Sequence, residues 1–190
     1  VKTSCGGTSL KANVTRYTSV ERDGRPFFYP EYEYESVLGG ALNEVVHYCD
    51  YDTLGNPRTV IANRADTASV VWGYGSRYPV ARVLGLAYGS LPRQAVSALE
   101  SAVSQSDVSS ALASLRGQLS GRALVSGWSH RPLFGVSSAV SANGYAVNYG
   151  YTDGGRLSSI SDADGIKNLY SYHYGGGASS GNYVESVRRN

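Results

Sequence analysis

Side chains able to do nucleophilic or metal chemistry are few in this chain of 190 residues. His47 and Cys49 are two residues apart in a strand-like segment, so they point to one side, while Asp50 and Asp52 point to the other. Such a pair begins a metal site or a Cys–His nucleophile, but each needs a third group. The sequence indicates no residue for this third group. We therefore expect no catalytic residue, no metal site and no cofactor.

Longer catalytic motifs are also missing. There is no Gly-x-Ser-x-Gly nucleophile elbow, and no glycine-rich phosphate loop leads to a lysine. Gly73-Tyr74-Gly75 is like the start of a dinucleotide fingerprint but lacks the third glycine. Asp162-Ala163-Asp164-Gly165 lacks the later ligands of a calcium loop, so we interpret it as a hairpin turn. The sequence predicts a protein that is not an enzyme.

Charge and composition exclude several classes of protein. The formal net charge is only +2, and nine of the fifteen acidic residues precede residue 67. The bases of the middle region are spaced rather than clustered, so we expect no nucleic-acid partner. No apolar run approaches the roughly 20 residues that span a bilayer. With 17% charged residues, 23 Gly and 16 Tyr, the chain is unlike a coiled coil or a helical bundle.

The two cysteines do not decide the redox compartment. Cys5 and Cys49 fit no zinc or redox spacing, and the sequence favours two free thiols over a disulfide between them. The chain contains no Met. We therefore expect it to be a piece of a longer protein.

An internal repeat of 20 to 21 residues is the strongest signal in the sequence. After Gly144, tyrosines follow at +5 and +7, and the same offsets recur after Gly165. A glycine precedes each of these by nine or ten residues. A degenerate third copy opens at Gly55, with Ala65 in place of the second glycine and Trp72 at +7. The residues that define the two regular copies are Gly135, Asn143, Gly144, Tyr149, Tyr151, Gly155, Arg156, Gly165, Tyr170 and Tyr172.

Each copy has the pattern of a β-hairpin. Asn143-Gly144 and Asp164-Gly165 suit two-residue turns in which both central residues have positive φ. Strands are predicted over residues 135–141, 145–151, 157–161 and 166–174, because polar and apolar residues alternate there. The repeats thus predict an antiparallel meander rich in tyrosine.

These residues resemble the Rhs/YD-repeat family. The resemblance rests on Tyr51-Asp52-Thr53-Leu54-Gly55-Asn56 and on Tyr151-Thr152-Asp153-Gly154-Gly155-Arg156-Leu157, where Thr152 replaces the usual Asp. Residues 71–81 and 131–136 are similar to large bacterial cell-surface Rhs-repeat proteins. The resemblance implies a β-shell and an extracellular or cell-surface location, and it implies almost nothing about activity.

The repeat residues have structural interpretations. Asp52 is placed to accept backbone N–H groups in its turn, and Gly55 permits a left-handed conformation. The tyrosines suit a thin sheet, with rings packed and hydroxyls hydrogen-bonded. The alternative is a ligand face that stacks sugars or binds a protein, for which the candidates are Trp72, Trp128 and Tyr174.

An insertion rich in Ala, Ser and Leu interrupts the repeats between Leu91 and Gly117. Its periodicity predicts two short helices, the first burying Val96, Leu99 and Val103. Ser106 is the predicted cap of the second, whose apolar face holds Val108, Leu112 and Leu115. We expect a helical hairpin that covers one face or edge of the sheet.

The whole chain is therefore predicted to be mainly β, an open, twisted antiparallel meander with an inserted helical hairpin. Its expected role is a non-enzymatic scaffold whose partners are flanking repeats of a longer chain. The alternatives are a glycan- or protein-binding module and part of a toxin-encapsulating shell. The predicted segments are an N-terminal extended or edge-strand region (1–44), a degenerate repeat (45–90), the helical insertion (91–117), two further repeats (118–174) and a flexible tail (175–190).

Overall fold

A computed structural model describes residues 1–5, 8–173 and 183–189 of the chain. The described strands form one antiparallel sheet in which each strand pairs with its neighbours in sequence, from β1 to β13. The predicted fold class is confirmed. The strands are β1 (Lys2–Cys5), β2 (Thr8–Arg22), β3 (Arg25–Val37), β4 (Asn43–Tyr51), β5 (Pro57–Ala62), β6 (Asp66–Gly73), β7 (Tyr78–Leu84), β8 (Leu124–Arg131), β9 (Gly135–Val140), β10 (Ala146–Tyr151), β11 (Leu157–Asp162), β12 (Gly165–His173) and β13 (Tyr183–Arg189).

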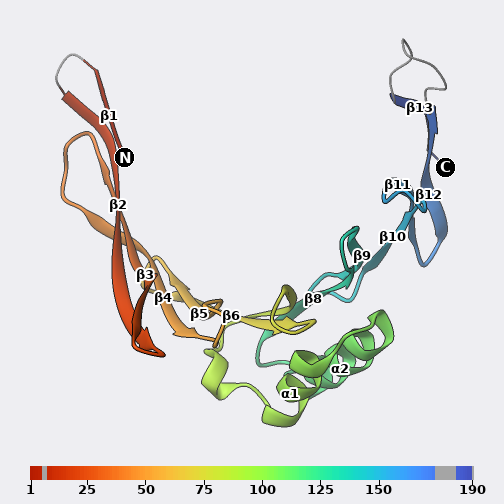
Figure 1. Cartoon of the computed structure of the whole chain (residues 1–190), viewed down its shortest axis with the longest axis horizontal. Helices are drawn as coiled ribbons and strands as arrows, with labels where there is room; N and C mark the ends of the chain where they lie inside the picture. The colour runs from red at the N-terminus through yellow and green to blue at the C-terminus, as the bar shows by residue number, and fades with distance from the viewer. Residues whose placement is uncertain (6–7, 174–182, 190) are drawn as a thin grey trace.

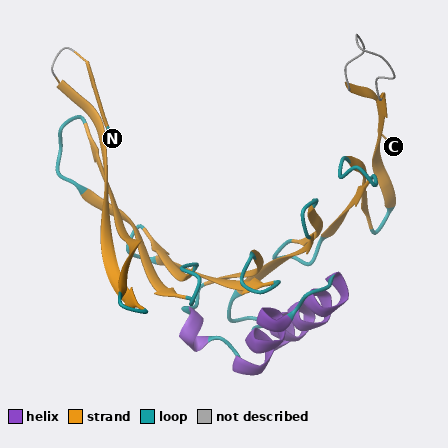
Figure 2. Cartoon of the chain, viewed as in Figure 1, coloured by secondary structure: helices purple, strands orange, loops and turns teal. Residues whose placement is uncertain are grey.

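The sheet bends into an arch, with β1 and β13 at its two ends and the helices outside the curve (Figure 1). Since the strands alternate in direction, their connections lie along two rims. The connections β2–β3, β4–β5, β6–β7, β8–β9 and β10–β11 make up what we call the first rim. The second rim carries the β3–β4, β5–β6, β9–β10 and β11–β12 connections, together with the helical insertion between β7 and β8 (Figure 2).

The insertion contains a short 3₁₀ helix, η1 (Tyr88–Ser90), followed by α1 (Arg93–Ser101) and α2 (Gln105–Gln118). Two details differ from the prediction. The cap of α2 is Ser104 rather than Ser106, because Ser104 and Asp107 form a reciprocal capping box. Since α1 ends at Ser101, Val103 lies in the linker and is 68% exposed.

The hydrophobic core lies between the helices and the convex face of β6, β7 and β8. On α1 the buried residues are Ala95, Val96 and Leu99, and on α2 they are Val108, Ala111, Leu112 and Leu115. Val71, Val80, Val83 and Val125 face them from the strands. The predicted helical hairpin thus covers a face of the sheet.

Two glycines allow this close approach. A Cβ on Gly127 would lie 2.5 Å from the Leu112 side chain. At Gly73 it would lie 2.8 Å from the Leu99 carbonyl oxygen. The sheet presents bare backbone where the helices come nearest, so any side chain here would push the insertion away.

The hairpin turns differ in detail from the two-residue turns that we predicted. Gly144 and Gly165 have positive φ, at 91° and 114°, whereas Asn143 and Asp164 do not. The two-residue loop between β11 and β12 is Ala163-Asp164, one residue earlier than predicted. Asp162 Oδ1 accepts the Asp164 N–H at 2.9 Å, which starts the turn at Asp162.

Both ends of the chain contain more strand pairing than predicted. The prolines Pro26 and Pro30 indicated an edge strand, yet β3 pairs with both β2 and β4. The register explains this, because β4 pairs only with Tyr32–Glu35 and the prolines lie in the uncovered half. In the predicted flexible tail, residues 183–189 form β13, and residues 175–182 lie outside the described residues.

Candidate functional site

Three turns of the repeats share one backbone geometry. In the turn Asp52–Asn56, the first N–H donates to the fifth carbonyl at 2.9 Å, and the Gly55 N–H donates to the Asp52 carbonyl at 3.1 Å. Residues 141–145 and 152–156 repeat both bonds. The fourth residue is a glycine with positive φ each time, namely Gly55, Gly144 and Gly155. The glycine therefore recurs because the fourth position of this turn has positive φ, which glycine adopts readily.

Asp52 organises its turn as the sequence predicts. One carboxylate oxygen accepts the N–H groups of Leu54 and Asn56, both at 2.8 Å, and the other accepts the Asn56 side-chain amide at 2.9 Å. Partial burial works to raise the pKa of Asp52, but these hydrogen bonds outweigh it and hold the pKa below its ordinary value. In the equivalent turn the Thr152 hydroxyl accepts the Arg156 N–H at 3.1 Å.

Replacing Asp52 with Ala should destabilise the protein by about 1–2 kcal/mol, since the turn amides of Leu54 and Asn56 lose a charged acceptor. The folded-state pKa is lowered, so the contribution of Asp52 is complete above the ordinary carboxyl pKa. It is lost as the pH falls through the folded-state value. Urea unfolding of wild type and Asp52→Ala across this acidic range should show the difference shrinking. Asp153→Ala, in the equivalent turn, is the matched control because the Asp153 side chain is exposed.

The aromatic residue at +7 of each repeat is tied to the backbone of the preceding strand. The Tyr151 hydroxyl donates to the Val136 carbonyl at 2.7 Å, and the Tyr172 hydroxyl donates to that of Leu157. In the degenerate copy, the Trp72 indole N–H donates to the Pro57 carbonyl at 2.9 Å. All three bonds span fifteen residues.

Tyr51 has the same kind of bond, to the Pro30 carbonyl. Burial, reinforced by nearby Tyr48, raises the pKa of Tyr51 to about 12. Burial also raises the pKa of Tyr151. These hydroxyls remain protonated donors at physiological pH, so the bonds to the backbone persist.

Aromatic rings also cover the repeat glycines. The Tyr29 ring lies where a Cβ on Gly55 would be and stacks on Tyr51, with ring centroids 4.9 Å apart. Phe134 similarly lies against Gly155. A Cβ on Gly135 would lie 2.7 Å from the Tyr151 hydroxyl. Ring and glycine thus connect successive turns along the first rim.

The remaining residues of the repeat motif also make contacts or strand pairs within the sheet. Asn56 joins two turns of the first rim, since its side-chain amide also donates to the Ser76 carbonyl at 2.8 Å. Arg156 lies over the Tyr172 ring, 5.2 Å from its centroid. Tyr149 pairs with Ile160, and Tyr170 pairs with Val187.

The described residues of the proposed ligand face come from the two strands that flank β7, Trp72 from β6 and Trp128 from β8. Trp72 is half-buried and uses its indole N–H internally. Trp128 lines a mainly apolar hollow of about 340 Å³ together with Tyr145 and Val147. Since its neighbour Gly127 faces α2, Trp128 points to the concave face. Tyr174 lies outside the described residues.

His47 and Cys49 share one side of β4, as predicted. The Cys49 sulfur lies 3.4 Å from His47 Nε2, and the His47 ring stacks on Tyr32. Burial raises the pKa of the thiol, and the negative charges of Asp50 and Glu31 raise it further. Among the described residues, no group of three His, Cys, Asp or Glu side chains is placed to hold a metal ion.

The thiol of Cys49 should react slowly with iodoacetamide at neutral pH, because little of it is thiolate. The measurement uses Cys5→Ser protein, so that Cys49 is the single target, with free cysteine as the reference. The same protein in denaturant should react at the reference rate. A native rate equal to that of free cysteine would contradict this environment.

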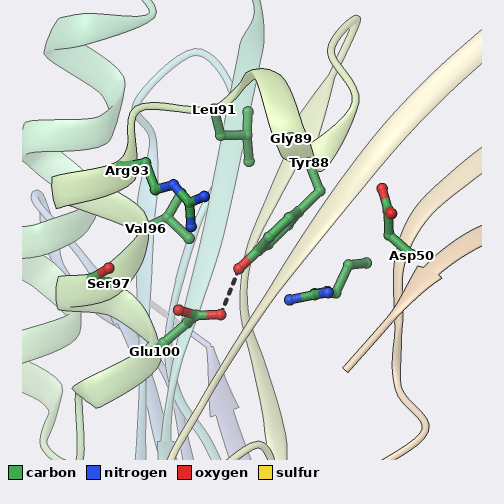
Figure 3. A pocket seen from close by; sticks show the side chains of 9 residues that line it. Asp50, Tyr88, Gly89, Leu91, Arg93, Val96, Ser97 and Glu100 are labelled. Carbon is green, nitrogen blue, oxygen red and sulfur yellow. Dashed lines mark hydrogen bonds between the residues drawn. The ribbon is translucent and has the colours of Figure 1, made fainter. Parts of the chain in front are cut away.

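Sequence reasoning missed a polar cleft beside the helical insertion (Figure 3). It has a volume of about 230 Å³ and lies between α1, η1 and the β4–β5 region. Tyr88 donates to Glu100, and the Arg58 guanidinium lies 4.7 Å from the Tyr88 ring centroid. Burial, followed by the bond to Glu100, raises the pKa of Tyr88 to about 12. These residues are far apart in sequence and belong to no motif.

Comparison with known protein families and with curated proteins finds no match for this chain. No helix in the described part of the chain is long and apolar enough to cross a membrane.

Proposed function

We propose that this chain is a non-enzymatic structural segment of a secreted or cell-surface shell of the Rhs/YD-repeat type. The observation that carries the proposal is the reuse of one turn and one aromatic-to-carbonyl bond along a single arched sheet. The residues of the repeat motif make their contacts within the protein. Their chemistry supports the packing of one repeat on the next. The location rests on the family resemblance of the sequence.

The open edges of the sheet support flanking repeats as partners. β1 pairs only with residues 8–12 of β2, so among the described residues Val14–Arg22 is paired on one side only, with β3. Val14, Tyr17 and Val20 are exposed there. β13 likewise pairs on one side, with β12. A long uncovered edge with apolar side chains favours further strand pairing, and we propose that strands of a longer chain supply it.

The concave face has a feature that both alternative functions could use. Trp128, Tyr145 and Val147 line its apolar hollow, a surface suited to contact another chain inside the arch. A toxin-encapsulating shell would use the face in this way. A glycan- or protein-binding module would use the same hollow with Trp128 as its anchor.

The test compares hydrogen exchange in this chain alone and in the native gene product, isolated from its cells with an antibody against this chain. In the proposed shell, those amides of residues 14–22 and 183–189 that point away from β3 and β12 exchange quickly in the isolated chain. They become protected in the native product, where neighbouring strands pair with them. The buried strands β6 to β8 serve as the internal reference, because their protection should be equal in both samples.

Two results would overturn the proposal. One is that the native gene product has a mass no greater than that of this chain. The other is a larger product in which both edges still exchange as quickly as in the isolated chain. Either result would remove flanking repeats as the partner.

A further inference from the structure

The cleft between α1 and the sheet combines charged and aromatic groups that the repeats do not use. Arg93 and Glu100 reach it from α1, while Asp50 and Arg58 reach it from the strand side. Tyr88 extends between these groups with its hydroxyl toward Glu100 (Figure 3). No ion pair joins the two arginines to the two acids among the described residues.

Hydrogen-bonding capacity remains unused on both sides of the cleft. In the described part of the chain, the Arg93 side chain makes no hydrogen bond, and Arg58 uses one donor for the Tyr51 carbonyl. Glu100 accepts Tyr88 at one carboxylate oxygen, and Asp50 accepts Thr59 at one. Each acid therefore keeps a second oxygen as an acceptor. A ligand that fits must offer an acceptor to arginine and donors to the acids.

The shape of the cleft limits the size of this ligand. Its volume of about 230 Å³ is below the roughly 300–1,000 Å³ that is typical of sites for drug-sized molecules. Arg58 covers part of the Tyr88 ring, and the buried side chains of Leu91 and Val96 add apolar lining on the α1 side. The lining suits one small ring with an apolar face and a polar edge.

We propose that this cleft binds a monomeric sugar acid, a hydroxyl-bearing ring with one carboxylate. The carboxylate pairs with the Arg93 guanidinium, whose planar donors match it in geometry. Ring hydroxyls donate to the free oxygens of Glu100 and Asp50, and the apolar ring face lies against Tyr88. A neutral sugar would leave Arg93 unpaired, and a simple carboxylate would leave the acids unpaired. The site goes beyond the shell proposal and does not depend on it.

The test is an amide NMR titration of the whole chain with glucuronate, with glucose and acetate as separate probes. We expect glucuronate to shift amides of residues 88–100, and glucose and acetate to bind at least tenfold more weakly. Arg93→Gln should weaken glucuronate binding about tenfold or more, because a charge-assisted hydrogen bond contributes about 1.5–3 kcal/mol. Arg93 is exposed, so this variant keeps the fold.

Arg82→Gln is the matched control, since Arg82 is an exposed arginine of β7 that does not line the cleft. It should bind glucuronate as wild type does. The proposal is overturned if glucuronate leaves the cleft amides unshifted or if acetate or glucose binds equally well. It is also overturned if both arginine variants have the same effect.

Discussion

Replacing Leu115 with Ala should lower the free energy of unfolding by about 2–5 kcal/mol. Leu115 is 0% exposed and belongs to the core between α2 and the sheet. The substitution removes apolar contacts and leaves a cavity, because the sheet backbone beneath the helix cannot collapse fully. Since this is the one large core among the described residues, the loss should be a major part of the total stability. Urea unfolding followed by circular dichroism measures it.

Leu133→Ala is the matched control, because the same atoms are removed from a side chain that is 96% exposed. It should change the stability by less than about 0.5 kcal/mol. Equal losses in the two variants would mean that the insertion does not rest on the sheet as described.

Replacing Gly55 with Ala should destabilise the protein by about 2–3 kcal/mol. Gly55 has φ of +87°, so a side chain there is strained by about 1–2 kcal/mol. The new Cβ would also lie 2.4 Å from the Tyr29 ring, which must move off Tyr51. The lost stacking adds about 0.5–1.5 kcal/mol. Thermal and urea unfolding measure the sum.

Gly75→Ala separates the two causes. Gly75 has φ of +68°, but its Cβ would meet nothing within 4 Å. This variant should therefore have only the backbone strain, about 1 kcal/mol. If both variants lose the same stability, the Tyr29 ring over Gly55 contributes nothing to the free energy of unfolding. The contact between successive turns would then not stabilise the fold.

Much of the fold could be predicted from the sequence because its signals are local. The repeat offsets placed Tyr151, Tyr172 and Trp72 at equivalent positions, and the structure gives all three the same backbone bond. The helical insertion was visible in its spacing of apolar residues. Its cap is Ser104 rather than Ser106 because only Ser104 has Asp107 three residues later, which is the spacing of a capping box.

The rest depended on contacts that no local pattern encodes. The close approach of the helices to one face depends on Gly73 and Gly127, whose role is evident only once the helices lie on them. The cleft of Tyr88, Glu100 and Arg58 joins distant segments. The sequence favours Trp72 as a ligand residue, but its indole N–H donates to the Pro57 carbonyl inside the protein.

The position of the insertion also has a consequence for the order of folding. Among the connections that the structure describes, every hairpin closes a short loop except β7–β8, whose connection covers residues 85–123. A loop about ten times longer costs about 2 kcal/mol more in closure entropy. We therefore expect the two arms of the arch to form independently and to join only when α1 and α2 have shortened that loop. Pulse-labelled hydrogen exchange should show β7–β8 protected last, and protection of this pair before the helices would contradict the expectation.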